Sequence, residues 1–110
     1  MVLEELIEKL SVKELAGMID HTLLKPEASY KLLEKYIEDT KKYSFKLLMI
    51  PLSLVEKALE IAGRTIELGV VVGFPLGSTS TGIKAAEAAE AGRLGVGEVD
   101  MVMNIHAFKS

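Results

Sequence analysis

The 110-residue sequence contains no cysteine and no tryptophan, and aromatic residues make up only 5% of it. The absence of cysteine excludes disulfide bonds, thiolate nucleophiles and cysteine-ligated metal sites. Positive charge is also scarce, because 13 basic residues stand against 16 acidic ones and the formal net charge is -3. Such a chain lacks the basic surface that binds nucleic acid, so no nucleic-acid partner is expected.

Long apolar runs are missing as well. The longest uncharged stretch, residues 68–83, contains four glycines and a proline. It is shorter than the roughly 18 apolar residues that indicate a membrane-spanning helix. The opening segment MVLEELIEKL is acidic and amphipathic, whereas a signal peptide begins with a basic segment followed by an apolar one. We therefore expect no membrane partner and a cytoplasmic location.

Hydrophobic periodicity predicts an alternation of strands and helices. Apolar residues at helical spacing predict a helix in residues 3–10, and Ser11 with Glu14 forms a capping box that begins a second one. Strands are predicted within residues 18–24 and at 45–50, 70–74 and 99–103, and helices from Pro26, from Pro51 and over 83–95. Strands that are apolar on both faces and joined by helices indicate an α/β fold with a parallel sheet.

Two architectures fit this order of elements: an open doubly wound sheet, or part of a (β/α)8 barrel. The spacing does not choose between them. A complete barrel needs about 250 residues, so this chain would supply four of its eight strands. In either case 110 residues form one domain with a core of its own.

Two of the three aspartates, Asp20 and Asp100, lie in or at the ends of apolar strands. Ligands of parallel α/β folds bind at the carboxyl ends of strands, so this placement suits a functional site. Strand alternation puts Asp100, Val102 and Asn104 on one face, and likewise Asp20 with Thr22. An aspartate that only accepts backbone hydrogen bonds or pairs with a lysine fits the same pattern, and the pattern leaves both roles open.

The remaining polar candidates are predicted to serve structure or to face solvent. The turn GVVVGFPLG, residues 69–77, is neither a dinucleotide motif nor a phosphate-binding Walker loop. His21 and His106 lack metal-ligand spacing, so we expect a structural His21 and a loop position for His106. Lys46, on the helix-facing side of its strand, and Lys84 are expected to be solvated.

Packing and capping roles are predicted for two further groups. Met49 shares a strand face with Phe45 and Leu47 and is expected to pack in the interior. The hydroxyl-bearing residues 78–81 are expected to cap the helix that follows them.

Several motifs occur together and in order between Ile19 and Ser110. They are IDHTLLKPEAS, VVVGFPLGSTS, the KAAEAAE helix, GEVDMVMNI and AFKS. In combination they resemble the deoxyribose-phosphate aldolase family, over the first half of a family member. The resemblance implies a parallel β/α half-barrel, the first four strands of a TIM (β/α)8 barrel with an N-terminal helical extension. Residues 1–110 are thus expected to form one partial barrel domain, with helices in 1–17 and strands one to four in 18–110.

The resemblance also implies an activity. Family members are class I aldolases, lyases of deoxyribonucleotide catabolism that reversibly cleave 2-deoxy-D-ribose 5-phosphate to glyceraldehyde 3-phosphate and acetaldehyde. They use a Schiff base and need neither metal nor cofactor. Asp100 matches the catalytic aspartate of strand four, which assists proton transfer, and Asp20 and Thr22 match strand-one positions that line the substrate pocket.

The family's Schiff-base lysine lies on strand six, and a second lysine on strand seven lowers its pKa. Neither strand is in this sequence, so we expect the 110-residue chain alone to be inactive. Two departures concern the pocket region: Met49-Ile50-Pro51 stands where the family often has a cysteine followed by V-N-P, and His106 replaces a glycine. Lys109 matches a family lysine that is not the Schiff-base residue.

A non-catalytic half-barrel, as a fragment or an engineered scaffold, is the alternative. A four-stranded parallel sheet has two free edges and an uncovered face, both of which promote association. Two copies related by a twofold axis would close eight strands, so a homo-oligomer is expected. Another phosphate-handling barrel isomerase or aldolase would leave DHTLLKP and EVDMV unexplained. In the complete enzyme the expected partner is a small phosphorylated sugar.

Overall fold

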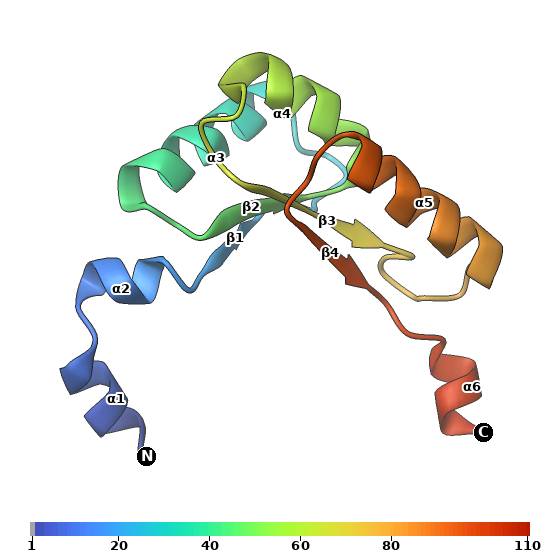
Figure 1. Cartoon of the computed structure of the whole chain (residues 1–110), viewed down its shortest axis with the longest axis horizontal. Helices are drawn as coiled ribbons and strands as arrows, with labels where there is room; N and C mark the ends of the chain where they lie inside the picture. Colours follow the sequence, from blue (N-terminus) through green and yellow to red (C-terminus); the bar gives the residue numbers. More distant parts are fainter. Residues whose placement is uncertain (1) are drawn as a thin grey trace.

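The computed structural model describes residues 2–110 as an arched sheet of four parallel strands with helices on its outer side (Figure 1). The elements in chain order are α1 (Leu3–Lys9), α2 (Val12–Ala16), β1 (Asp20–Thr22), α3 (Tyr30–Tyr43), β2 (Leu47–Ile50), the 3-10 turn η1 (Leu52–Leu54), α4 (Val55–Ala62), β3 (Leu68–Val72), α5 (Thr81–Arg93), β4 (Glu98–Met101) and α6 (Ile105–Lys109).

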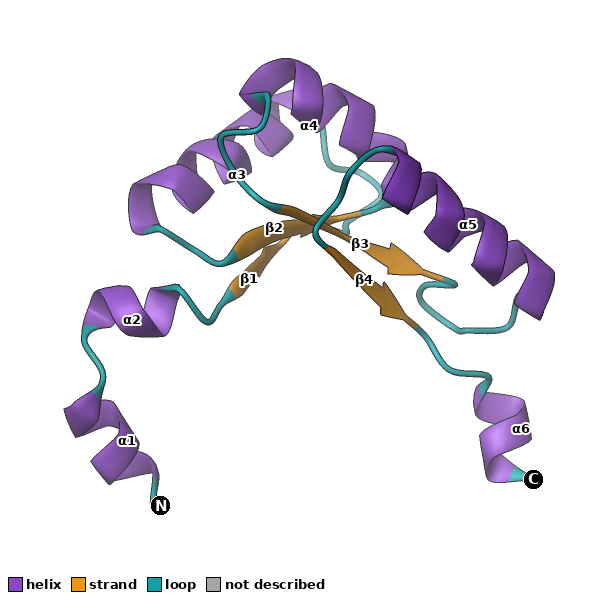
Figure 2. Ribbon diagram, viewed as in Figure 1, coloured by secondary structure: helices purple, strands orange, loops and turns teal. Residues whose placement is uncertain are grey.

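The order of the strands distinguishes the two architectures that the sequence left open. The sheet runs β1-β2-β3-β4, so neighbours in the chain are neighbours in the sheet. Helices α3, α4 and α5 all lie on the same side of it (Figure 2). A doubly wound sheet reverses its strand order and carries helices on both faces, whereas a β/α barrel does neither. The chain is therefore a partial β/α barrel, as predicted.

The main hydrophobic core lies between the sheet and these helices. Alternate strand residues contribute its inner layer, among them Leu48, Ile50, Leu68, Val70 and Val72. The helices supply the opposite layer, with Leu33 and Ile37 from α3, Val55 and Ala58 from α4, and Ala91 from α5. Because successive strand residues point to opposite faces, the residues between these positions face away from the helices.

Side-chain caps set where several helices begin. The hydroxyl of Ser29 accepts a hydrogen bond from the backbone of Leu32, so α3 begins after it. The prediction that Pro26 and Glu27 form the first turn of that helix was wrong, because they lie in a separate turn. Ser80 caps α5 in the same way, and the capping box of Ser11 at α2 is confirmed.

Several boundaries and one helix differ from the predictions. Strand β2 begins at Leu47 rather than at residue 45, β4 spans Glu98–Met101 rather than residues 99–103, and α5 spans Thr81–Arg93 rather than residues 83–95. Strand β3 begins at Leu68 rather than at residue 70, and it ends before Gly73, whose φ of +64° breaks the extended backbone. Helix α6 was not predicted, since five residues are too short for a periodic pattern. His106 therefore lies in a helix and not in a loop.

The two ends of the chain extend away from the main core. Helix α1 buries none of its residues, and Leu3, Leu6 and Ile7 are exposed on it. Phe108 of α6 is exposed in the same way at the opposite end of the arch (Figure 1). None of the helices described within residues 2–110 has the length and apolar character needed to cross a membrane.

Candidate functional site

The sheet face without helices carries the predicted site residues. Thr22 is in register with Met49, and Asp100 with Val71, so these four side chains share that face. A cavity of about 310 Å³ opens on it, lined by Asp20, Thr22, Leu24, Met49, Val71, Phe74, Asp100, Met101 and Val102. The structure thus brings together Asp20, Thr22 and Asp100, which lie up to 80 positions apart in the sequence.

A cluster of carboxylates lies on this face, with Asp20 at the start of β1, Glu98 at the start of β4 and Asp100 two residues further along β4. Asp20, Glu98 and Asp100 each contribute an oxygen, and these oxygens lie within 4.8 Å of one another. The ammonium of Lys46 lies 3.2 Å from Oε1 of Glu98. Lys46 is exposed to solvent, as predicted, but its side chain does not stay on the helix side of the sheet, because it reaches across to Glu98 of β4.

Sequence reasoning missed Glu98 and Lys46 as members of this site. A signal for Glu98 was available, since it precedes Asp100 by two residues and strand alternation gives both the same face. Lys46 comes immediately before β2, where alternation no longer fixes the direction of a long side chain. Only the position of its partner on a distant strand reveals its role.

The charges of the cluster shift the pKa values of its members. The sheet beneath Asp100 removes part of the water around its carboxyl group, and this desolvation, with the negative charge of Glu98, raises the pKa of Asp100. Desolvation, followed by the hydrogen bond with Glu98 and its negative charge, raises the pKa of Asp20. The hydrogen bond from Lys46 is the main cause that lowers the pKa of Glu98, and the pair raises the pKa of Lys46.

The backbone carbonyl and the side-chain carboxyl of Asp20 differ in their hydrogen bonding. Its backbone carbonyl accepts a hydrogen bond from the hydroxyl of Thr22, 2.8 Å away. Its Oδ1 atom is buried and has no hydrogen-bond partner among the residues that the structure describes. A buried polar atom without a partner is costly, so this oxygen is the least satisfied atom of the cluster.

Met49 fills the floor of the helix-free face, next to a glycine. It is buried with Leu47 and Val71, which confirms its predicted interior position. A Cβ atom at Gly69 would lie 2.8 Å from Cε of Met49, so the absence of a side chain at Gly69 makes room for this methionine.

Known proteins with similar sequences and folds identify the family. No family model matches the chain. It is 48% identical over 95 residues to the deoxyribose-phosphate aldolase of Clostridium novyi and 45% identical over 93 residues to that of Streptococcus sanguinis, in each case over 84% of this chain and 42% of the relative. Its fold matches the tetrameric deoxyribose phosphate aldolase of Aeropyrum pernix with a TM-score of 0.88 and 28% identity, over 96% of this chain and 46% of that one. The chain belongs to the deoxyribose-phosphate aldolase family.

The chain spans less than half of the length of these deoxyribose-phosphate aldolases. Its sheet has two outer edges, on β1 and β4, that pair with no strand within residues 2–110. The roles of Asp100, Asp20 and Thr22 remain predictions drawn from the family resemblance; their common cavity is a property of the structure.

Lys84 lies at the carboxyl edge of the sheet, and the prediction that it is solvated was wrong. Only 7% of this residue is exposed. Its methylene groups pass the backbone at Gly73, where a Cβ atom would lie 2.9 Å from Cε, and its ammonium donates to the carbonyl of Val102 at 2.9 Å. Glu87 accepts a hydrogen bond from the backbone of Gly73. Helix α5 therefore holds the ends of β3 and β4.

The two histidines lie apart from the cluster. The ring of His21 stacks on Tyr36 of α3, with centroids 4.4 Å apart and planes at 12°, and contacts Phe45 at 4.9 Å. These contacts agree with the structural role expected for it. His106 borders a small polar cavity of about 280 Å³ between α6 and the loop before α5, together with Ser78 and Thr79.

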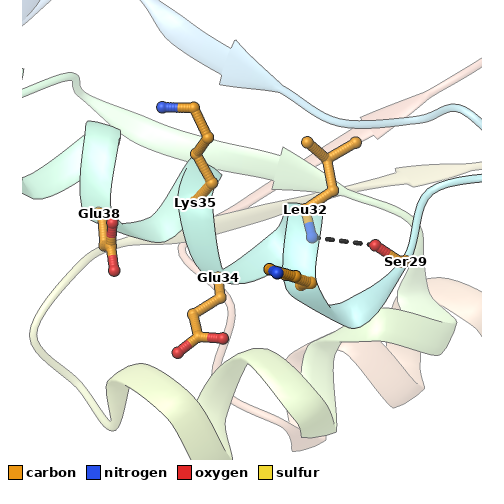
Figure 3. A pocket seen from close by; sticks show the side chains of 6 residues that line it. Ser29, Leu32, Glu34, Lys35 and Glu38 are labelled. Carbon is orange, nitrogen blue, oxygen red and sulfur yellow. Dashed lines mark hydrogen bonds between the residues drawn. The ribbon is translucent and has the colours of Figure 1, made fainter.

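A larger groove of about 530 Å³ runs along the exposed side of α3 (Figure 3). It is lined by Ser29, Lys31, Leu32, Glu34, Lys35 and Glu38, all from one helix and its cap. Its charges alternate in sign along the helix surface, and none of the residues predicted for the site lies in it. The cavity on the helix-free face is the better candidate site because it joins polar residues from separate strands.

Proposed function

We propose that this chain supplies the first four strands of a class I deoxyribose-phosphate aldolase. The reaction is the reversible cleavage of 2-deoxy-D-ribose 5-phosphate to glyceraldehyde 3-phosphate and acetaldehyde. One observation carries the proposal: Asp20, Thr22 and Asp100 share one cavity on the helix-free face of a partial barrel. Residues 18–110 would form the barrel portion, with residues 1–17 as an extension.

In this proposal Asp100 moves the proton. A carboxyl group with a raised pKa keeps its proton closer to neutral pH, which suits a group that must both accept and donate it. Asp20 and Thr22 line the pocket beside it. The amine that forms the Schiff base would come from strands outside residues 1–110, so this chain alone would have no activity. A cytoplasmic location accompanies the proposal, because a phosphorylated sugar does not cross a membrane unaided.

A chimera tests the proposal. The chain would be fused to the part of the Aeropyrum pernix aldolase that it does not cover, and retro-aldol turnover and borohydride trapping would be measured. The expected result is turnover and a trapped adduct in the chimera and neither in the isolated chain. Asp100→Asn in the chimera should lower kcat by about 10²- to 10⁴-fold, as for the loss of a general acid or base.

Glu34→Gln is the matched control, because Glu34 lies on the exposed side of α3, and it should leave kcat unchanged. Adduct formation by the isolated chain, or full activity of the Asp100→Asn chimera, would contradict the proposal.

Self-association without catalysis is the second candidate. The free edges of β1 and β4 and the exposed apolar residues of α1 support it. In this candidate β4 of one copy pairs with β1 of the other and closes eight strands. Sedimentation equilibrium of the chain should show a dimer or a larger species. A monomer that unfolds cooperatively would exclude this candidate.

A further inference from the structure

Two residues beside Asp100 have no part in the proposed reaction. Glu98 lies two positions before it on β4, and Lys46 reaches Glu98 from the start of β2. The proposed function explains why Asp100 is in the cavity, but it does not explain why a second carboxylate and a lysine accompany it. Their presence calls for a physical reason, because gathering like charges on one sheet face costs free energy.

The charges on this face come from β1, β4 and the residue that precedes β2. Strand β1 supplies Asp20, the residue before β2 supplies Lys46, and β4 supplies Glu98 and Asp100. Strand β3 contributes Gly69 and Val71 there and no titratable group. The face therefore carries three carboxyl groups and one ammonium, and full ionisation would leave an excess of two negative charges.

Geometry decides which carboxyl group is ionised. The three oxygens lie within 4.8 Å of one another, so their protons are released in coupled steps. Glu98 is the one that accepts the hydrogen bond of Lys46, at 3.2 Å, and a neighbouring positive charge favours its carboxylate form. Glu98 therefore releases its proton before the two aspartates do.

The unsatisfied oxygen of Asp20 fits the same arrangement. Oδ1 of Asp20 is buried, and no donor within residues 2–110 reaches it. A protonated aspartic acid is itself a donor, and an ionised glutamate within reach is a strong acceptor. A hydrogen bond from an aspartic acid to Glu98 satisfies the cluster without any additional group.

We propose that Lys46 and Glu98 are positioning residues for Asp100. Lys46 keeps Glu98 ionised and in place, and Glu98 accepts a hydrogen bond from whichever of Asp20 and Asp100 carries the proton. The significance of this arrangement for catalysis rests on the proposed function, whereas the arrangement itself does not. Its consequence is that two residues outside the reaction set the pH at which Asp100 exchanges its proton.

The two positioning residues should act with opposite signs. Removing the charge of Glu98 takes away the negative neighbour and the acceptor, so Asp100 should release its proton at lower pH. Removing Lys46 takes away the positive charge that favours the ionised form of Asp100, so Asp100 should hold its proton to higher pH. A purely structural role for either residue would not produce opposite shifts.

Carboxyl carbon NMR of the 110-residue chain tests this directly. The titration midpoint of Asp100 would be followed in the wild type, in Glu98→Gln and in Lys46→Met, with Asp100→Asn used to assign the signal. The expected result is a shift to lower pH in Glu98→Gln and to higher pH in Lys46→Met. Glu34→Gln and Lys41→Met, on the exposed surface of α3, are the matched controls and should leave the Asp100 midpoint unchanged.

Amide spectra would establish that each variant is folded. If Lys46→Met does not fold, Lys46→Gln replaces it, and the Glu98→Gln shift remains decisive. Shifts in the same direction in both variants, or none in either, would overturn the proposal. This titration does not depend on turnover. An inactive chimera would therefore contradict the proposed function without contradicting the positioning roles of Lys46 and Glu98, and an active chimera would not establish those roles.

Discussion

The ammonium of Lys84 donates a hydrogen bond to the carbonyl oxygen of Val102, 2.9 Å away, and connects α5 to the residue that follows β4. Val102 lies two residues beyond Asp100 and borders the same cavity. The bond therefore fixes the direction in which the chain leaves the candidate site. The sequence did not predict this bond, because Lys84 lies in the first turn of a helix and lysines at such positions are mostly exposed.

Lys84→Ala should lower the free energy of unfolding by about 1.5–3 kcal/mol, the range for a hydrogen bond that involves a charged group. Lys84→Met keeps most of the packed methylene stem and should be less destabilising than the alanine variant. Urea denaturation measures both. Lys31→Met, in the exposed groove of α3, is the control and should change little; an equal effect of Lys84→Met and Lys31→Met would show that the hydrogen bond contributes nothing.

Gly77 and Gly92 form a matched pair for glycine-to-alanine substitution. Gly77 has a φ of +68°, and a Cβ atom there would collide with the backbone carbonyl of Met103. Gly77→Ala should therefore cost at least about 1–2 kcal/mol from the left-handed backbone alone. Gly92 is in α5, where, apart from its chain neighbours and the helix's own backbone, no atom of residues 2–110 lies within 4 Å of the position that a Cβ would take, and Gly92→Ala should stabilise by about 0.5–1 kcal/mol. Thermal unfolding of the two variants should give shifts of opposite sign.

The aspartates of the cluster make stability depend on pH. The pKa values of Asp20 and Asp100 are raised on folding above the ordinary 3.8, by desolvation and by Glu98. Their contribution to stability is then complete below pH 3.8 and is lost as the pH rises through the raised values. In Asp20→Asn one of these groups cannot ionise, so the unfolding free energy should fall less between acid and neutral pH than in the wild type.

Urea denaturation across this pH range measures the difference. Thr22→Val is the control, because it alters the same cavity without removing a titratable group, and it should retain the pH dependence of the wild type. Identical pH dependence in Asp20→Asn and the wild type would show that Asp20 is not coupled to the cluster.

The stability of the protein should depend on an aromatic ring at position 21 and not on the ring nitrogens of His21. Its Nε2 atom is buried without a partner in the described residues, while the ring stacks on Tyr36. His21→Phe keeps an aromatic ring and removes the unsatisfied nitrogen, so its unfolding free energy should equal or exceed that of the wild type. His21→Ala should lose about 0.5–1.5 kcal/mol for the aromatic pair in addition to buried area. Denaturation of both variants distinguishes a packing role from a polar one.

The sequence predicted the order of the elements because each strand and each long helix carries its own periodic pattern. The apolar run of β2 is such a local signal, and the strand predicted there was found at Leu47–Ile50. Strand alternation also placed Asp20 on the same face as Thr22, and Asp100 on the same face as Val102. The choice of a barrel came from a resemblance and was then confirmed by the strand order, which no local pattern contains.

The errors concern interactions between distant segments. Lys46 and Glu98 are 52 residues apart, and Lys84 and Val102 are 18 apart, so neither contact leaves a local pattern. A lysine has a flexible stem, and the direction it takes depends on which acceptor lies within reach after folding. Short elements such as α6 are not predicted for another reason, since five residues form little more than one helical turn.

The arrangement of the strands has a consequence for how the chain opens. Strands β2 and β3 have a neighbour on each side, whereas β1 and β4 each have a neighbour on one side only within residues 2–110. Backbone amides of β2 and β3 should therefore exchange with deuterium last, in the largest cooperative opening of the molecule. Asp20 and Asp100 lie on the two strands that open first. These two aspartates thus belong to the least protected part of the sheet, although the cavity that they line also includes residues of the central strands. A partner strand that pairs with β1 or β4 should slow amide exchange there more than in β2 and β3.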